Sequence, residues 1–242
     1  MKADESLRPW GEIASALGSL LRPPYLVFGL LNALVTVASI GITELLGPRP
    51  AGGDLWLDVI AGIFLALASI YIQIAVILAA ASNPETRAVD AWIKVALKHR
   101  CFWRYLGVTI LIALLLVLGA VVFLVGAIVA GGIVALGQPS VVLERTRPVA
   151  AINRSSVLTK PARRTVALVF AIFWIAPAVW PLTAQILDIE LSTAADVALG
   201  AVNAPIVIAA NVAITRVFVK LGGSPAPPLQ TLLYKSKAGT SG

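Results

Sequence analysis

The chain has 242 residues, of which 59% are hydrophobic and 13% are charged, and its formal net charge is +7. A soluble domain carries about 25% charged residues to cover its surface, so this composition excludes a water-soluble particle. The apolar residues form continuous blocks, which predicts membrane-spanning helices and excludes the alternating pattern of a transmembrane β-barrel. We interpret the positive charge as an orientation signal and expect no nucleic acid partner.

The first two apolar blocks are long enough to be membrane spans. They cover Leu26–Leu46 and Leu57–Ala81, and a span needs roughly 20 helical residues. The first block is longer than the apolar core of a signal peptide, and no A-x-A cleavage site follows it. We therefore expect it to be a retained span.

The third block, Tyr105–Leu136, holds 32 residues, too many for one span and too few for two complete ones. If it crosses and returns, 18 of the 19 Lys and Arg residues lie on one side of the membrane, with only Arg49 on the other. The positive-inside rule favours that arrangement. We predict a helical hairpin that reverses between Gly119 and Gly126. Its short arms either tilt in a thinned membrane or form a re-entrant hairpin shielded by other helices.

The last two blocks, Thr165–Leu187 and Val197–Val219, bring the prediction to six membrane helices in an all-α bundle. Prolines interrupt both of these blocks, and uncharged polar residues lie within several spans. This pattern indicates either a polar pocket between helices or ordinary hydrogen bonding between helices. The candidate pocket residues are Gln73, Pro177, Gln185, Asn203, Pro205 and Asn211.

Three segments outside the spans place apolar residues at near-helical spacing: Pro9–Arg22, Ala88–Arg100 and Pro148–Lys160. We expect each to be an amphipathic helix in the cytoplasmic interface, with Trp10 and Trp92 as anchors in the first two. Each precedes a pair of spans, so the chain reads as three units of one short helix followed by a hairpin.

The segment Pro139–Arg164 concentrates basic residues. Each basic side chain near a membrane surface attracts anionic lipid by about 1 kcal/mol. We therefore predict that this segment contacts anionic headgroups, although the same charges also determine topology. The candidate lipid-binding residues are Arg145, Arg147, Arg154, Lys160, Arg163 and Arg164.

The same segment carries a family resemblance, in Pro139, Val142-Leu143-Glu144, Ala150-Ala151, Arg154-Ser155-Ser156, Leu158 and Arg163-Arg164. With Trp10 and Pro23-Pro24, it resembles the YciC-like membrane proteins and the membrane domain fused to some glycerophosphoryl diester phosphodiesterases, over most of residues 8–220. It departs in having Arg145-Thr146-Arg147 where a glycine usually follows the glutamate. The resemblance implies six membrane helices with interfacial helices. The phosphodiesterase activity belongs to a separate soluble domain and is not carried over.

We expect a single integral membrane domain over residues 1–220 and a Pro-rich linker with a flexible cytoplasmic tail over residues 221–242. No catalytic motif stands out, and His99 with Cys101 lacks the neighbouring carboxylates of a metal site, so we predict no enzyme, no cofactor and no metal. The predicted function is an accessory or structural protein of the cell membrane with both termini cytoplasmic. Its partners would be anionic lipid and either a membrane protein or a second copy. The alternative is a small-molecule transporter or permease subunit with a site between the last two helices.

Overall fold

The computed structural model describes residues 9–46, 55–82, 88–98, 101–122, 124–175, 193–226 and 229, and these residues are predominantly helical, with no strand among them. The long helices are α2 (Pro23–Leu46), α3 (Leu55–Ala80), α5 (Phe102–Val122), α6 (Leu124–Val134) and α11 (Thr193–Lys220). The shorter ones are α1 (Pro9–Leu20), α4 (Val89–Lys98), α7 (Gly137–Leu143), α8 (Pro148–Thr159), the 3₁₀ turn η2 (Lys160–Ala162), α9 (Arg163–Phe170) and the π-helix η3 (Ala171–Ile175). The predicted all-α fold is confirmed.

Five segments of the described chain are long and apolar enough to cross a membrane: Pro23–Ile40, Val59–Ala80, Phe102–Gly119, Gly126–Leu143 and Val197–Lys220. They correspond to four of the predicted blocks, the third block supplying two segments. The chain is therefore a multi-pass membrane protein. The remaining predicted block, Thr165–Leu187, is described only as far as Ile175, so the rest of that expected helix lies outside the described residues.

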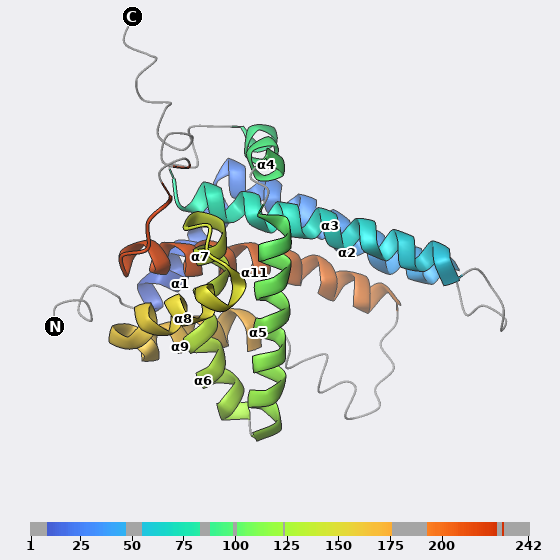
Figure 1. Ribbon diagram of the computed structural model, residues 1–242. Helices are drawn as coiled ribbons and strands as arrows, with labels where there is room; N and C mark the ends of the chain where they lie inside the picture. Colours follow the sequence, from blue (N-terminus) through green and yellow to red (C-terminus); the bar gives the residue numbers. More distant parts are fainter. Residues whose placement is uncertain are drawn as a thin grey trace, which may run out of the picture.

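The membrane helices form two groups that diverge from a common end (Figure 1). In one group α2, α3 and α11 lie side by side. In the other, α5 and α6 form an antiparallel hairpin, and α9 packs on α6. The short helices α1, α4, α7 and α8 lie around the common end, at the left and top of the view. Contacts between α11 and both α7 and α9 join the two groups.

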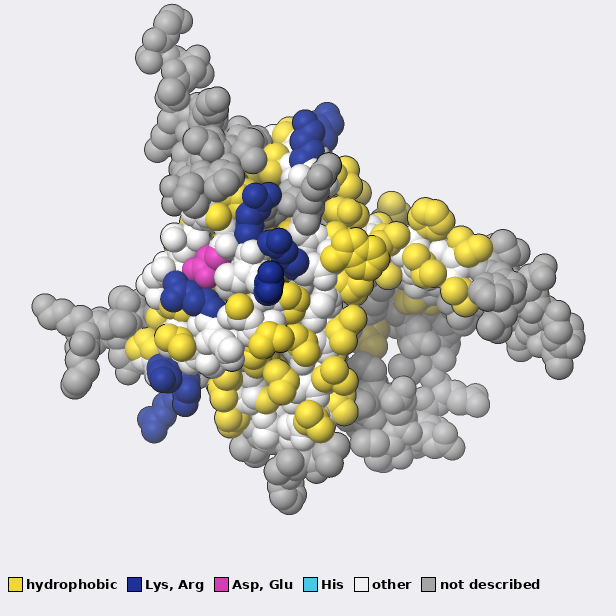
Figure 2. All heavy atoms as spheres, viewed as in Figure 1, with side chains coloured by type: hydrophobic (Ala, Val, Ile, Leu, Met, Phe, Trp, Pro, Cys, Tyr) yellow, Lys and Arg dark blue, Asp and Glu magenta, His cyan; other side chains and the backbone are white. Residues whose placement is uncertain are grey.

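The described Lys and Arg residues follow this arrangement. They lie in the short helices, in the connections that flank them, or near the ends of α5 and α11 at the common end. Figure 2 shows the basic side chains in the left and upper parts of the view, while the surface of the diverging helices is largely hydrophobic. Large apolar side chains such as Leu34, Phe64 and Leu118 are 64–68% exposed there. A surface of this kind is stable in contact with lipid and unfavourable in water.

The predicted hairpin is confirmed, with its reversal between Gly119 and Gly126. The two glycines allow close contact between the arms, because a Cβ atom on Gly126 would overlap the carbonyl oxygen of Gly119. Farther along α6, a Cβ on Gly132 would come within 2.7 Å of the Ala167 side chain in α9. Small residues therefore set the spacing of α6 against both of its neighbours.

The three predicted short helices are present as α1, α4 and α8. The tryptophans of the first two helices differ in burial: Trp92 of α4 is fully buried, whereas Trp10 of α1 is 67% exposed. An ion pair between Glu12 and Lys220 holds α1 against the end of α11. Each of the three helices precedes membrane helices in the chain, which is the order expected from the three-unit interpretation.

Candidate functional site

The basic segment predicted to contact lipid, Pro139–Arg164, runs from α7 through α8 and η2 to the start of α9 and includes the connection between α7 and α8. Here Arg154 donates to both carboxylate oxygens of Glu144, with Nη2–Oε1 and Nε–Oε2 distances of 3.1 and 3.2 Å. Ser140 donates to the same carboxylate at 3.2 Å. Glu144 is only 15% exposed in its side chain, so this pair fixes the connection and largely neutralises the charge of Arg154.

The other predicted lipid-binding residues differ from Arg154 in their contacts. Arg145 adopts a φ of +58°, the left-handed region that favours glycine, and its carbonyl oxygen accepts a hydrogen bond of 2.7 Å from Arg104 of α5. The other four are exposed, and within the described part of the chain no carboxylate pairs with them. They are Arg147, Lys160, Arg163 and Arg164.

A second feature lies deeper, where the apolar segment Gly126–Leu143 breaks between α6 and α7. Ser155 of α8 serves both sides of the break. Its hydroxyl donates to the carbonyl of Ile133 at 2.6 Å and accepts from the backbone N–H of Leu136 at 3.1 Å. A break in a membrane helix leaves backbone groups that need partners, and this fully buried side chain supplies them.

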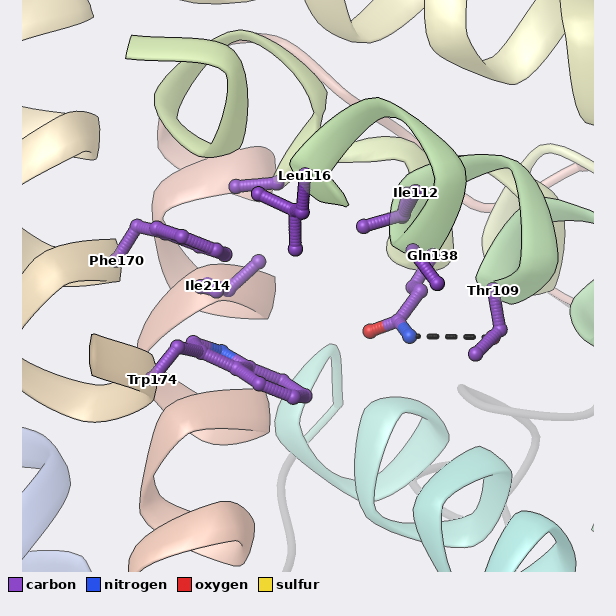
Figure 3. A pocket seen from close by; sticks show the side chains of 9 residues that line it. Thr109, Ile112, Leu116, Gln138, Phe170, Trp174 and Ile214 are labelled. Carbon is purple, nitrogen blue, oxygen red and sulfur yellow. Dashed lines mark hydrogen bonds between the residues drawn. The ribbon is translucent and has the colours of Figure 1, made fainter. Parts of the chain in front are cut away.

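A pocket with a cavity volume of about 110 Å³ lies next to this break, between α5, the α6–α7 connection, α7, α9, η3 and α11 (Figure 3). The π-helix η3 forms one wall of the pocket. π-Helical segments are rare in proteins, and many of those that occur lie at functional sites. The hydrophobic residues that line the pocket, apart from Trp174, are Ile112, Ala113, Leu116, Ala135, Phe170 and Ile214.

Three polar side chains line the same pocket. Gln138 donates its amide N–H to the Thr109 hydroxyl at 3.3 Å, and in Figure 3 its amide oxygen is turned toward the middle of the pocket. The indole ring of Trp174 stacks on Phe170, with ring centroids 6.1 Å apart. Its N–H is buried and has no hydrogen-bond partner among the described residues. The mainly apolar pocket thus has an acceptor facing its middle and a buried donor, without a partner among the described residues, in its wall.

A separate chain of hydrogen bonds connects four membrane helices. The Tyr105 hydroxyl donates to Gln73 at 2.7 Å, Gln73 donates to Ser69 at 3.2 Å, and Ser69 donates to Asn32 at 3.3 Å. Asn32 in turn donates to the carbonyl of Ala204 in α11, next to the proline of that helix. These bonds satisfy buried polar groups and link α2, α3, α5 and α11, which is a packing role.

The predicted polar pocket residues are distributed over several places. Gln73 belongs to the hydrogen-bond chain, and Pro205 lines a second pocket of about 160 Å³ beside α2. Asn211 is 2% exposed, and its amide nitrogen has no partner among the described residues. Neither of the two pockets has Gln73, Asn203 or Asn211 among its described lining residues. Pro177 and Gln185 lie outside the described residues.

Sequence reasoning missed Thr109, Gln138 and Trp174 as a group. Each is a single residue in a different apolar segment, and they meet only because α7 turns away from α6. One signal was present: Gln138 follows the apolar block directly and lies one residue after a glycine and one before a proline. Comparisons with protein-family models, with curated proteins and with solved structures gave no match.

Proposed function

We propose that this chain is a non-enzymatic accessory protein of the cell membrane that binds anionic lipid headgroups at its basic end. The exposed basic side chains at that end carry the proposal. Arg163 and Arg164 begin α9, whose Val166 and Phe170 are buried in the bundle, while the two arginine side chains are exposed. Cations in that position attract anionic headgroups.

Exposed apolar residues at the same end support the proposal. Trp10 and Leu21 near α1, Trp103 of α5 and Val149 of α8 are between 65% and 81% exposed. Aromatic and aliphatic side chains beside basic ones are typical of surfaces that lie at headgroup level. The positive-inside rule then assigns this end, and with it both termini, to the cytoplasm.

The interior favours an accessory protein over a transporter. A transport pathway needs a polar cavity between helices, whereas the two pockets described above are lined mainly by apolar residues. The helices α3 and α11 contribute alanines such as Ala75, Ala79, Ala209 and Ala213 to the core. Tight packing through small residues is typical of a structural bundle.

The lipid proposal is tested with the variant Arg163→Gln/Arg164→Gln. At about 1 kcal/mol for each basic residue, we expect roughly 30-fold weaker retention of phosphatidylglycerol. Native mass spectrometry of the purified protein measures this retention. The matched control is Lys94→Gln/Lys98→Gln, which removes the same formal charge from α4, where Lys94 is already paired with Asp90 at 3.1 Å. Equal retention in both variants and in the original chain, or retention that salt does not weaken, would contradict headgroup binding.

A further inference from the structure

The pocket beside the α6–α7 break opens toward the lipid-facing side of α5. Ala113 lines the pocket and is itself exposed, and the next residue, Leu114, is 55% exposed on the outer surface of the same helix. Both lie within the apolar segment Phe102–Gly119. The opening therefore lies within the hydrocarbon region, and a molecule that enters it comes from the bilayer.

The lining restricts what that molecule is. No described lining residue carries a charge, so a charged headgroup inside the pocket would lose its hydration without gaining a counterion. The apolar walls formed by residues such as Leu116 and Phe170 suit a hydrocarbon chain. Besides the Thr109 hydroxyl, two polar groups belong to the pocket: a donor, the indole N–H of Trp174, which has no partner among the described residues, and an acceptor, the amide oxygen of Gln138, which faces the middle of the pocket.

We propose that this pocket binds an uncharged long-chain lipid through its hydroxyl group, as in a fatty alcohol or a diacylglycerol. A hydroxyl both accepts from Trp174 and donates to Gln138, whereas an ester carbonyl only accepts. The hydrocarbon chain lies along Ile112 and Leu116 and leaves past Ala113 into the bilayer. The indole N–H, which is buried and has no partner among the described residues, then gains one.

The site is independent of the basic end. It uses none of the exposed arginines, and its ligand carries no charge. Binding is therefore measured in nanodiscs of phosphatidylcholine, which lack anionic lipid. A failure of this proposal leaves the result for Arg163 and Arg164 unchanged, and the reverse also holds.

The probe is a hexadecanol that carries a photoreactive diazirine on its chain. After irradiation, we expect cross-links to peptides of α5 and α7, mapped by mass spectrometry. Oleyl alcohol should compete for this site, and methyl oleate, which has the chain but no hydroxyl, should compete about 3- to 10-fold less well, as expected for the loss of one hydrogen bond. Equal competition by the two would overturn the hydroxyl assignment. An absence of saturable labelling would overturn the site.

Variants of the lining locate the ligand. Ala113→Phe closes the opening and should abolish specific labelling, while Leu114→Phe, at the adjacent lipid-facing position, should leave it unchanged. Trp174→Phe removes the N–H but keeps an aromatic ring, and Gln138→Leu removes the acceptor. Each change should weaken competition by oleyl alcohol about 3- to 10-fold. In the Gln138→Leu variant, competition by methyl oleate should be less affected, because an ester has no hydrogen to donate to Gln138. Labelling that survives Ala113→Phe, or alcohol affinity unchanged in both polar variants, would contradict the proposal. Helical circular dichroism and thermal unfolding verify that each variant is folded.

Discussion

Ser155 is the side chain that binds the backbone on both sides of the α6–α7 break. Its hydroxyl accepts from one side of the break and donates to the other, and it is fully buried. In Ser155→Ala, the Ile133 carbonyl and the Leu136 N–H would both lose this partner in a region without water. Each unsatisfied buried group costs about 1–3 kcal/mol, so we expect a marked fall in the temperature of thermal unfolding.

Ser156→Ala is the matched control for that prediction. The Ser156 hydroxyl bonds only to the carbonyl of Asn153 within its own helix, at 2.8 Å, and its loss should change stability by less than about 0.5 kcal/mol. Equal unfolding temperatures for the two variants would show that the break is held by packing rather than by Ser155.

The residues of the candidate sites differ in how far the sequence alone predicted them. The exposure of Arg163 and Arg164 is as expected, because a basic pair before an apolar segment lies at the helix end. The pairing of Arg154 with Glu144 was not predicted, since ten residues and a turn separate them and the turn includes the left-handed Arg145. Trp174 had no sequence signal for an unpaired N–H, because pairing depends on neighbours from other helices.

Among the elements, the α5–α6 hairpin shows most clearly how composition sets packing. Block length and charge predicted its existence, and the glycines predicted its reversal point. The break between α6 and α7 was not predicted, because Ala135 and Leu136 look like any other part of an apolar helix. A tertiary contact from α8 stabilises the break, and such contacts do not appear in a local pattern.

We predict that Gly126→Ala destabilises the hairpin. The new Cβ would overlap the carbonyl oxygen of Gly119, so the two arms would have to separate, at a cost of about 1–3 kcal/mol. Gly62→Ala in α3 is the control, because nothing lies within 4 Å of its Cβ position. That change should stabilise the helix by up to about 1 kcal/mol, since alanine favours helix more than glycine. Chemical or thermal unfolding in detergent measures both, and a stabilised Gly126→Ala variant would contradict the close approach of the arms.

At the scale of the whole molecule, the two groups of helices meet where the basic residues gather and separate toward the apolar end (Figures 1 and 2). The sequence predicted the gathering of charge, because each loop on that side carries Lys or Arg. It did not predict the divergence, which follows from the contacts of α11 with α2 and α3 on one side and with α9 and η3 on the other. Both groups cross one bilayer only if each is tilted, and tilt reduces the depth that a helix of given length covers.

The last prediction is the orientation of the whole molecule. Basic residues are retained on the cytoplasmic side, so a cysteine at Asn153 of α8 should be cytoplasmic, and one at Ala194, near the start of α11, should be external. Cys101 is 3% exposed, and burial raises the pKa of its thiol to about 11, which makes it react slowly at neutral pH. It is replaced by alanine so that each variant has one thiol. In intact cells, an impermeant maleimide should label Ala194→Cys and leave Asn153→Cys unlabelled until the membrane is permeabilised. The opposite pattern would place the basic end outside the cell, and headgroup binding at a cytoplasmic surface would then be excluded.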